Sequence, residues 1–198
     1  MGLTIALKHD GVVYMGSDSL VSKYGVKHYM VSENNYRIFR VKGCKEALMS
    51  LDGSLVEHNV ARCQSPIPAG EPVRVELNFE YMVNKFVPQL LDLFYDRHIL
   101  DISDDNYCCQ SDMLVAYKDK IFEIYPDGGV LESSDYAAIG QGAVEALGSL
   151  FTTRNIDDPK ERIKMALMAG MRTSNKISYP LIITDTKTFE FEIIEDMR

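Results

Sequence analysis

The feature that most constrains the fold is a β-hairpin signal at the start of the chain. Two runs rich in β-forming residues, LTIALKH (3–9) and VVYMGSD (12–18), flank the dipeptide Asp10-Gly11. Asp-Gly between two such runs is a strong hairpin signal, because both residues tolerate the positive φ angles of a tight type I′ turn. The chain is therefore predicted to begin with two antiparallel strands.

The remaining pattern alternates between strand pairs and helix pairs. Apolar residues recur at helical spacing after Asp52 and Ser54, either of which could cap that helix, and in a longer helix that Pro88 is expected to kink. This order suggests two sheets packed face to face with helices outside both. The further strands are predicted at 36–41, 46–51, 112–118, 121–126, 136–139, 180–186 and 188–195, and the helices at about 55–61, 76–97, 143–153 and 159–177.

Length and composition exclude several classes of function. A chain of 198 residues that is 46% hydrophobic can form one domain with a substantial core. The net charge is −8 and the basic residues are scattered, so a nucleic acid partner is not expected. No apolar run approaches the roughly 20 residues that span a bilayer, and no signal peptide is evident, so we expect a cytoplasmic protein with no membrane partner.

Metal and cofactor sites are not predicted either. The four histidines are dispersed without an HxxxH or HExxH motif. The four cysteines contain no CxxC pair, and free buried thiols are favoured over a disulfide framework. These cysteines are Cys44, Cys63, Cys108 and Cys109.

Four segments, taken in order, resemble the proteasome β-type and HslV-type peptidases. They are TIALKHDGVVYMGSDS, the pair YRIFRV and EALMSLDGS, DMLVAYKDKIFEIYPDGG, and AAIGQGAVEALGSLF with the later helix ALMAGMRTSNK. The resemblance runs from residue 2 to the last strand. It implies an α/β (α+β) fold in one domain over residues 1–198: a four-layer αββα sandwich of two mainly antiparallel sheets flanked by helix pairs.

The resemblance also implies a particular chemistry. In this family the first residue of the mature chain is a threonine, whose hydroxyl is the nucleophile and whose free α-amine acts as the base. A nearby lysine lowers the pKa of that amine, an aspartate holds the lysine, and a backbone N–H at the start of the first helix stabilises the oxyanion.

The nucleophile itself is missing from this sequence. Asp18 matches the family's aspartate, and counting back from it places Gly2 at the position of the threonine; matching the Thr-Ile pair by eye would place Leu3 there instead. Neither residue carries a hydroxyl. Thr4 is the nearest alternative, but its use requires cleavage after Leu3 and a one-residue shift that would turn inward side chains outward.

Most supporting positions are altered as well. The family's lysine falls on Arg37, which is bulkier and permanently charged. The first glycine of the oxyanion segment falls on Asp52, and the serine of the Gly-Ser-Gly turn falls on Gln141. The late aspartate falls on Met171, whereas the serine three positions later is retained as Ser174.

These changes predict a catalytically inactive protein that acts through assembly as a homo-oligomeric ring or stack, without a cofactor. Two alternatives remain open. The chain could be an active threonine-type peptidase or amidohydrolase that uses Thr4 on a peptide or protein substrate. It could also bind a small molecule or peptide in the cleft that is the active site in the family, with Arg37 forming two hydrogen bonds to a carboxylate of the ligand beside Asp18. An Asp18–Arg37 salt bridge with a purely structural role is the simpler expectation for this pair.

Overall fold

The first of two sheets contains the predicted opening hairpin. The computed structural model describes residues 2–71, 75–103 and 106–196. The first sheet has five strands in the order β12-β1-β2-β13-β14, and every neighbouring pair is antiparallel. Its strands are β1 (Leu3–His9), β2 (Val12–Asp18), β12 (Tyr136–Gly140), β13 (Leu181–Asp185) and β14 (Glu192–Ile194).

The second sheet also has five antiparallel strands, in the order β11-β10-β9-β6-β5. The chain enters it from β2 through a small hairpin, β3 (Leu20–Lys23) and β4 (Val26–Tyr29). Its strands are β5 (Ile38–Arg40), β6 (Ala47–Asp52), β9 (Asp112–Tyr117), β10 (Lys120–Ile124) and β11 (Val130–Ser133).

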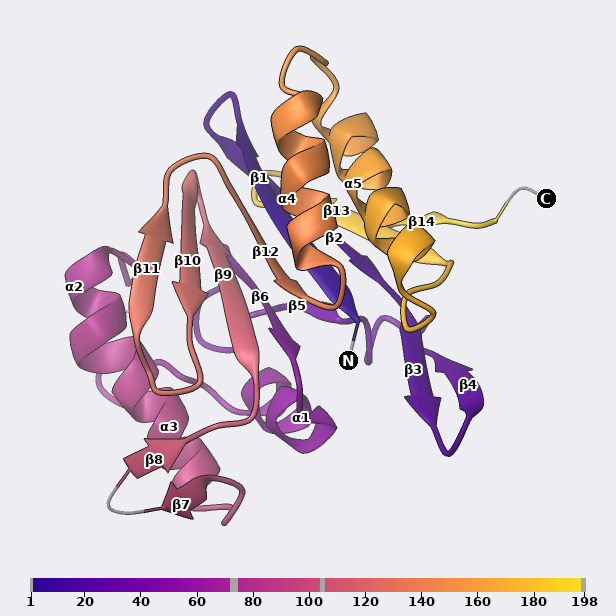
Figure 1. The fold of residues 1–198 in the computed structure, drawn as a ribbon. Coiled ribbons are helices and arrows are strands. Elements are labelled where there is room, and N and C mark those ends of the chain that lie inside the picture. Colours follow the sequence, from indigo (N-terminus) through magenta and orange to yellow (C-terminus); the bar gives the residue numbers. More distant parts are fainter. Residues whose placement is uncertain (1, 72–74, 104–105, 197–198) are drawn as a thin grey trace.

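Helices cover the outer face of each sheet (Figure 1). On the first sheet lie α4 (Ala143–Thr152) and α5 (Pro159–Thr173), which pack against each other and against β1, β2 and β12. On the second lie α1 (Leu55–Cys63) and a long helix made of α2 (Phe79–Tyr81), a π-helical segment (Met82–Phe86) and α3 (Val87–Tyr95). The predicted four-layer αββα architecture is confirmed.

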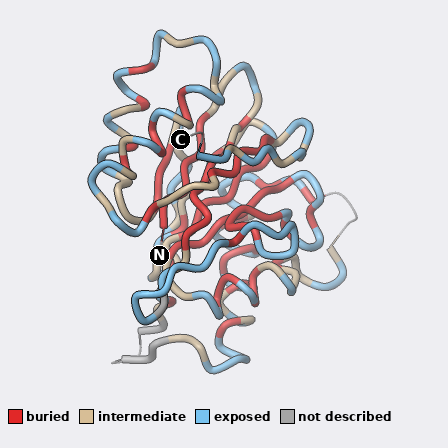
Figure 2. The backbone as a smooth tube through the Cα atoms, turned by 90° about the vertical axis from the view of Figure 1, so that its right-hand side faces the viewer, coloured by how far each residue is buried: buried red, intermediate tan, exposed pale blue. Residues whose placement is uncertain are grey.

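Three apolar clusters hold the four layers together. The alternation of β1 shows how one strand serves two of them: Leu3, Ile5 and Leu7 pack towards α4 and α5, whereas Ala6 faces the second sheet. The third cluster joins the second sheet to α1, α3 and the π-helical segment, whose Phe86 is fully buried. Figure 2 shows the buried residues, drawn red, gathered in the interior of the molecule with exposed segments around them.

Short strands account for the main omissions of the sequence reading. The sequence did not predict the hairpin β3–β4 or the strand β11. A further hairpin that was not predicted, β7 (Asp101–Ser103) and β8 (Asn106–Cys108), lies in an acidic stretch of the chain. Strands of three or four residues span too few positions to establish a period of two.

Two helices differ in detail from their predictions. The long helix, which Pro88 was expected to kink, contains a π-helical segment just before that proline, and the Val87 N–H bonds to the carbonyl of Met82, five residues back. The last helix ends at Thr173 rather than near Ile177, because Ser174 has extended backbone angles. The strand predicted at 188–195 is confined to β14. The Asp185 carboxylate accepts hydrogen bonds from the backbone N–H groups of Lys187 and Thr188, and these bonds hold the residues before β14 in a turn.

Candidate active site

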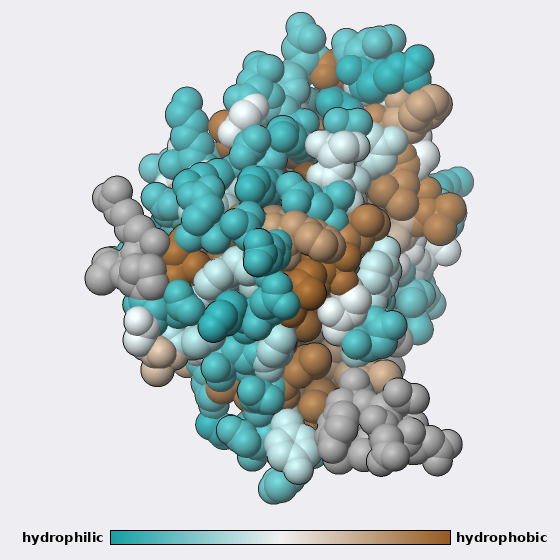
Figure 3. Space-filling model, turned by 90° about the vertical axis from the view of Figure 1, so that its left-hand side faces the viewer, coloured by the Kyte–Doolittle hydropathy of each residue, from teal (hydrophilic) through white to brown (hydrophobic). Residues whose placement is uncertain are grey.

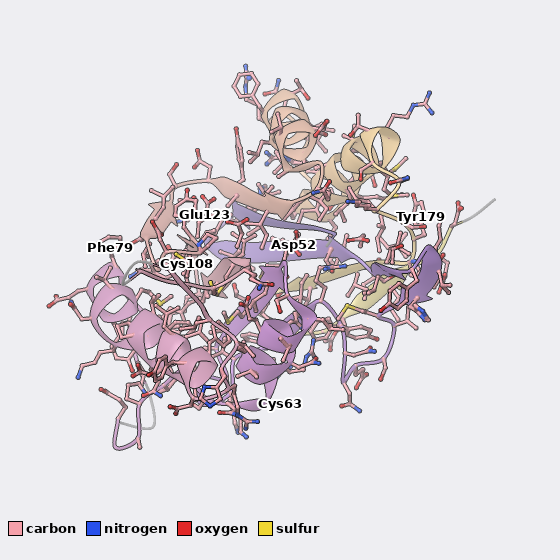
Figure 4. The ribbon with its side chains drawn as sticks, turned by 60° about the horizontal axis from the view of Figure 1, so that its bottom comes forward. Asp52, Cys63, Phe79, Cys108, Glu123 and Tyr179 are labelled. Atoms are coloured by element: carbon pink, nitrogen blue, oxygen red, sulfur yellow. The ribbon has the colours of Figure 1, made fainter. Side chains whose placement is uncertain are left out.

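A buried cluster of charged residues surrounds Gly2, at the point where β1 begins. Asp18 is the last residue of β2 and Asp52 is the last residue of β6, while Arg37 directly precedes β5. The exposed fractions of Asp18, Arg37 and Asp52 are 0%, 4% and 6%. The first sheet thus supplies Gly2 and Asp18, and the second supplies Arg37 and Asp52. Figure 4 shows Asp52 near the middle of the molecule.

The Asp18 carboxylate fixes the chain on both sides of β2. Its Oδ1 accepts a hydrogen bond from the Leu3 N–H at 2.9 Å, and its Oδ2 accepts one from the Leu20 N–H at 2.9 Å. Burial raises the pKa of Asp18, since loss of hydration outweighs the opposing effects of Arg37 and the backbone N–H groups. This aspartate therefore orders the start of β1 and of β3.

Arg37 is engaged by several internal acceptors. Its Nε donates to the Asp18 carbonyl at 3.3 Å and its Nη2 donates to the Leu20 carbonyl at 2.9 Å. Its Nε lies 3.5 Å from Asp18 Oδ1, and its Nη1 lies 3.6 Å from Asp52 Oδ1. The expected Asp18–Arg37 salt bridge is present, and these contacts spread the guanidinium over three internal partners. That arrangement does not favour bidentate binding of an added carboxylate.

Gly2 has no room for a side chain. A Cβ atom at this position would fall on Asp18 Oδ1 and on Nη2 and Cζ of Arg37, closer than real Cβ contacts come. The backbone is held tightly as well, since Gly2 N donates to Asp52 Oδ1 at 2.5 Å and the Gly2 carbonyl accepts from Gln141 N at 2.7 Å. The volume that a side chain at this position would need is filled by the charge cluster.

Asp52 points into the site. The sequence raised the possibility that it caps α1, but its Oδ1 binds Gly2, and Ser54 occupies the N-cap position without a side-chain hydrogen bond. Asp112 lies opposite Asp52 in the β6–β9 register, and burial together with the Asp52 charge raises the pKa of Asp112. A carboxylate at the position of Asp52 is unfavourable for an oxyanion beside it.

The other predicted positions lie around this cluster or apart from it. Gln141 contributes its backbone N–H, as described. Met171 packs in the apolar cluster between α4, α5 and the first sheet, and Ser174 caps the end of α5, where its Oγ accepts from the Lys176 N–H at 3.2 Å. No contact of Met171 or Ser174 with the charge cluster is found within the described residues.

Thr4 is inaccessible. It is fully buried between the two sheets, where its Oγ1 lies 2.8 Å from Ser50 Oγ. It sits inside β1, opposite Ile139 in β12 and Ser17 in β2. Exposing its backbone nitrogen as a chain terminus would remove Gly2 and Leu3, which anchor the start of the strand.

The sequence reading missed His58, which lies in α1 and is 3% exposed. The carbonyl of Arg37 accepts a hydrogen bond from its Nε2 at 2.9 Å, so the proton resides on that nitrogen. Burial lowers the pKa of His58 to about 4. Helical spacing could have identified this residue. A helix face that buries Val60 and Ala61 also buries His58, which lies within one turn of both. Leu55 and Val56, the apolar residues of the first turn, are exposed.

The space beside the cluster is small. A cavity of about 30 Å³ is lined in part by Arg37, His58 and Met30, which is room for about two water molecules. A much larger groove of about 920 Å³ lies elsewhere, lined in part by Arg62 and Phe189 and by no residue of the charge cluster. Within the described residues, no group of histidine, cysteine and acidic side chains is arranged to hold a metal ion.

Comparison with known proteins assigns the fold. No protein-family model and no curated protein sequence matches the chain. Among solved structures, it is similar to BPH from Thiobacillus denitrificans, with a TM-score of 0.71 and 18% identity, covering 98% of this chain and 99% of that one. It is also similar to HslV from Trypanosoma brucei, with a TM-score of 0.63 and 12% identity over 92% and 98% of the two chains. A helical assembly of Anbu from Pseudomonas aeruginosa gives 0.68 and 12% over 99% and 88%.

The chain has the HslV and proteasome β-type fold. The resemblance stated from the sequence is thereby confirmed at the level of architecture. At these low identities the comparison concerns the fold alone, so chemistry has to be argued from the residues around Gly2. Across the described ranges, no helix is both long enough and apolar enough to cross a membrane.

Proposed function

We propose that this chain is a catalytically inactive protein of the HslV and proteasome β type, and that it acts by assembling with further copies of itself. The observation that carries the first part is the environment of Gly2. The Arg37 guanidinium and the Asp18 carboxylate fill the space that a nucleophilic side chain at that position would need.

Electrostatics supports the same conclusion. An N-terminal nucleophile needs an amine with a depressed pKa and donors aimed at the developing oxyanion. Here Arg37 takes the place of the lysine and is spread over internal acceptors. The carboxylate of Asp52 stands where donors would be needed, and it repels negative charge.

A peptide-hydrolysis assay combined with intact-mass measurement tests the inactivity. The purified protein should release no fluorophore from peptide amides that end in acidic, basic or apolar residues. The matched variant is Thr4→Val, which removes the alternative hydroxyl and keeps the side-chain volume. Hydrolysis that is present in the natural chain and abolished in Thr4→Val, together with a mass that corresponds to a chain starting at Thr4, would establish the peptidase alternative instead.

The assembly proposal rests on exposed apolar side chains on two helices. On α4, Val144 is 81% exposed and Phe151 is 57% exposed, and their spacing of seven residues puts them on one face. On the adjacent helix α5, Met165 and Met168 are exposed as well. Large apolar side chains gathered on one outer layer are typical of a protein interface.

A second face can extend a pair into a ring or stack. Brown, apolar atoms gather near the middle of the face in Figure 3, the side of the molecule on which α2 and β11 lie. On α2, the adjoining π-helical segment and β11, the side chains of Phe79, Val83 and Leu131 are exposed. Two different apolar faces on one subunit are what a ring or helical stack requires, because each copy must contact more than one neighbour.

Light scattering after gel filtration tests the assembly. We expect a mass of several chains for the natural protein and a smaller mass for the double variant Val144→Glu/Phe151→Glu, since buried unpaired carboxylates oppose association. Leu131→Glu is the matched control for the other face and should leave the α4–α5 contact intact. A natural protein that is monomeric at micromolar concentration would refute the proposal.

A further inference from the structure

The hairpin β3–β4 projects from the body of the molecule. It forms a separate two-stranded sheet, and in Figure 1 it extends to the lower right, away from both five-stranded sheets. Its base is held in place, because the Asp18 carboxylate accepts a hydrogen bond from the Leu20 N–H and the Ser19 carbonyl accepts one from the Met30 N–H at 2.8 Å. A two-stranded hairpin is only marginally stable by itself in water, so an anchored hairpin of this kind is suited to pack against another surface.

This projection, the β3–β4 arm (residues 20–31), is both aromatic and basic. Tyr24 and Gly25 form its turn with φ angles of 53° and 78°, as in the type I′ turns of tight hairpins. The turn presents Tyr24 at the tip, where it is 94% exposed, and Val26 and Tyr29 are exposed behind it. The arm contains two lysines and no acidic residue, although the whole chain has a net charge of −8. One of these lysines, Lys27, is exposed on β4.

A groove with the opposite charge lies along α3. It has a volume of about 430 Å³, and we call it the α3 groove; its lining residues are Pro88, Leu91, Asp92, Tyr95 and Leu100. Asp92 is the charged residue of this lining, and Asp96 is exposed one helical turn further on. Residues 87–96 include these two aspartates and no basic residue. The α3 groove therefore combines a mainly apolar floor with an acidic rim.

We propose that the β3–β4 arm of one copy of the chain docks in the α3 groove of the next copy, with the Tyr24 ring on the apolar floor and Lys27 beside Asp92 and Asp96. The inference rests on the proposed assembly and specifies one of its contacts. Complementary charge supports this occupant, because rim charges of opposite sign orient two partners and exclude incorrect ones. Tyrosine is also among the residues that most often anchor the centre of an interface.

The positions of the arm and the groove determine what such a contact builds. In Figure 1 the arm lies at the lower right and α3 lies at the lower left, so the two features meet between copies and not within one copy. A contact between two different patches is heterologous, and it leaves each pair with one unused arm and one unused groove for further copies. Repetition of this contact produces a ring or a helical stack. The exposed side chains of α4 and α5 lie on another layer and remain available for a second kind of contact.

A charge exchange between the arm and the groove tests the proposal. The variants are Lys27→Glu, Asp92→Lys and the double variant that carries both changes, and sedimentation velocity over a range of chain concentrations gives the dissociation constant of each. We expect each single reversal to weaken association roughly tenfold, and the double variant to recover most of that loss, because opposite charges face each other again. Tyr24→Ala should weaken association by about 30-fold, as expected for an aromatic anchor.

The matched control is Lys45→Glu, which reverses an exposed lysine in the turn between β5 and β6 and should leave association unchanged. Thermal unfolding of every variant separates lost association from lost folding. Single reversals that associate like the natural chain, or a double variant that associates no better than the single ones, would overturn the docking while the assembly itself stands. A natural chain that is monomeric throughout would refute the assembly and the docking together.

Photochemical crosslinking identifies the partner surface directly. The photoreactive residue p-benzoyl-phenylalanine takes the place of Tyr24, and illumination of the assembled protein is followed by digestion and mass spectrometry. We expect crosslinked peptides that join position 24 of one copy to residues 88–100 of another. Crosslinks confined to other segments of the chain, or to a different protein, would overturn the proposal.

Discussion

Adding one methyl group at Gly2 tests the packing on which the site depends. In Gly2→Ala the new Cβ would overlap Asp18 Oδ1 and the Arg37 guanidinium, so the buried salt bridge would have to move. Overpacking a core costs about 1–3 kcal/mol, and full loss of a buried pair costs about 3–5 kcal/mol. Because the side chains can shift in part, we expect the free energy of unfolding to fall by about 2–4 kcal/mol.

Thermal unfolding followed by circular dichroism measures this loss. For a chain of this size each kcal/mol lowers Tm by about 2–4 °C, so the expected decrease in Tm is roughly 5–15 °C. Gly148→Ala is the matched control, because Gly148 lies on the exposed face of α4 and an added Cβ meets nothing within 4 Å. The control should be stabilised by about 0.5–1 kcal/mol, since alanine favours a helix.

The two variants make the same chemical change in opposite surroundings. If Gly2→Ala melts within a degree or two of the natural protein, the Arg37 guanidinium does not fill the space beside residue 2. The steric part of the argument for inactivity would then fail.

Three further outcomes follow from the same site. The folded pKa of His58, about 4, lies below its unfolded value of 6.5, so its stabilising effect is complete above pH 6.5 and is lost as pH falls towards 4. Urea titrations should show about 2 kcal/mol of this loss between pH 6.5 and pH 5, and His58→Gln should lack this component. Thr4→Val should lower the free energy of unfolding by about 1 kcal/mol, measured in urea, because it leaves Ser50 Oγ without its buried partner. Gly2→Thr alone should hydrolyse no peptide amide, and any activity should appear only when Arg37→Lys and Asp52→Gly accompany it; activity of the single variant would contradict the role of the charge cluster.

The sequence predicted the candidate site only in part. Matching motifs identified Gly2, Arg37 and Asp52 as altered positions and Asp18 as a retained one, and these four residues do lie together. It could not predict that the guanidinium would fill the space at Gly2, because that depends on how closely the ends of two different sheets approach.

His58 was missed for a related reason. The first turn of α1 offers Leu55 and Val56 as an apolar face, yet the helix turns them outward and buries His58 instead. Spacing gives the period of a helix, whereas the neighbouring layer decides which face is covered. The Arg37 carbonyl, which accepts the hydrogen bond of His58, lies 21 residues away in the sequence.

By itself, the sequence determined the opening hairpin, the order of the main strands and helices, and the absence of a hydroxyl at residue 2. Those properties are local, since they depend on turn residues and on periods of about 2 and 3.6 residues. The tertiary structure alone decided what stands in place of the nucleophile. Residues 2, 18, 37 and 52 are far apart along the chain, and packing two sheets face to face brings their charges into one buried cluster.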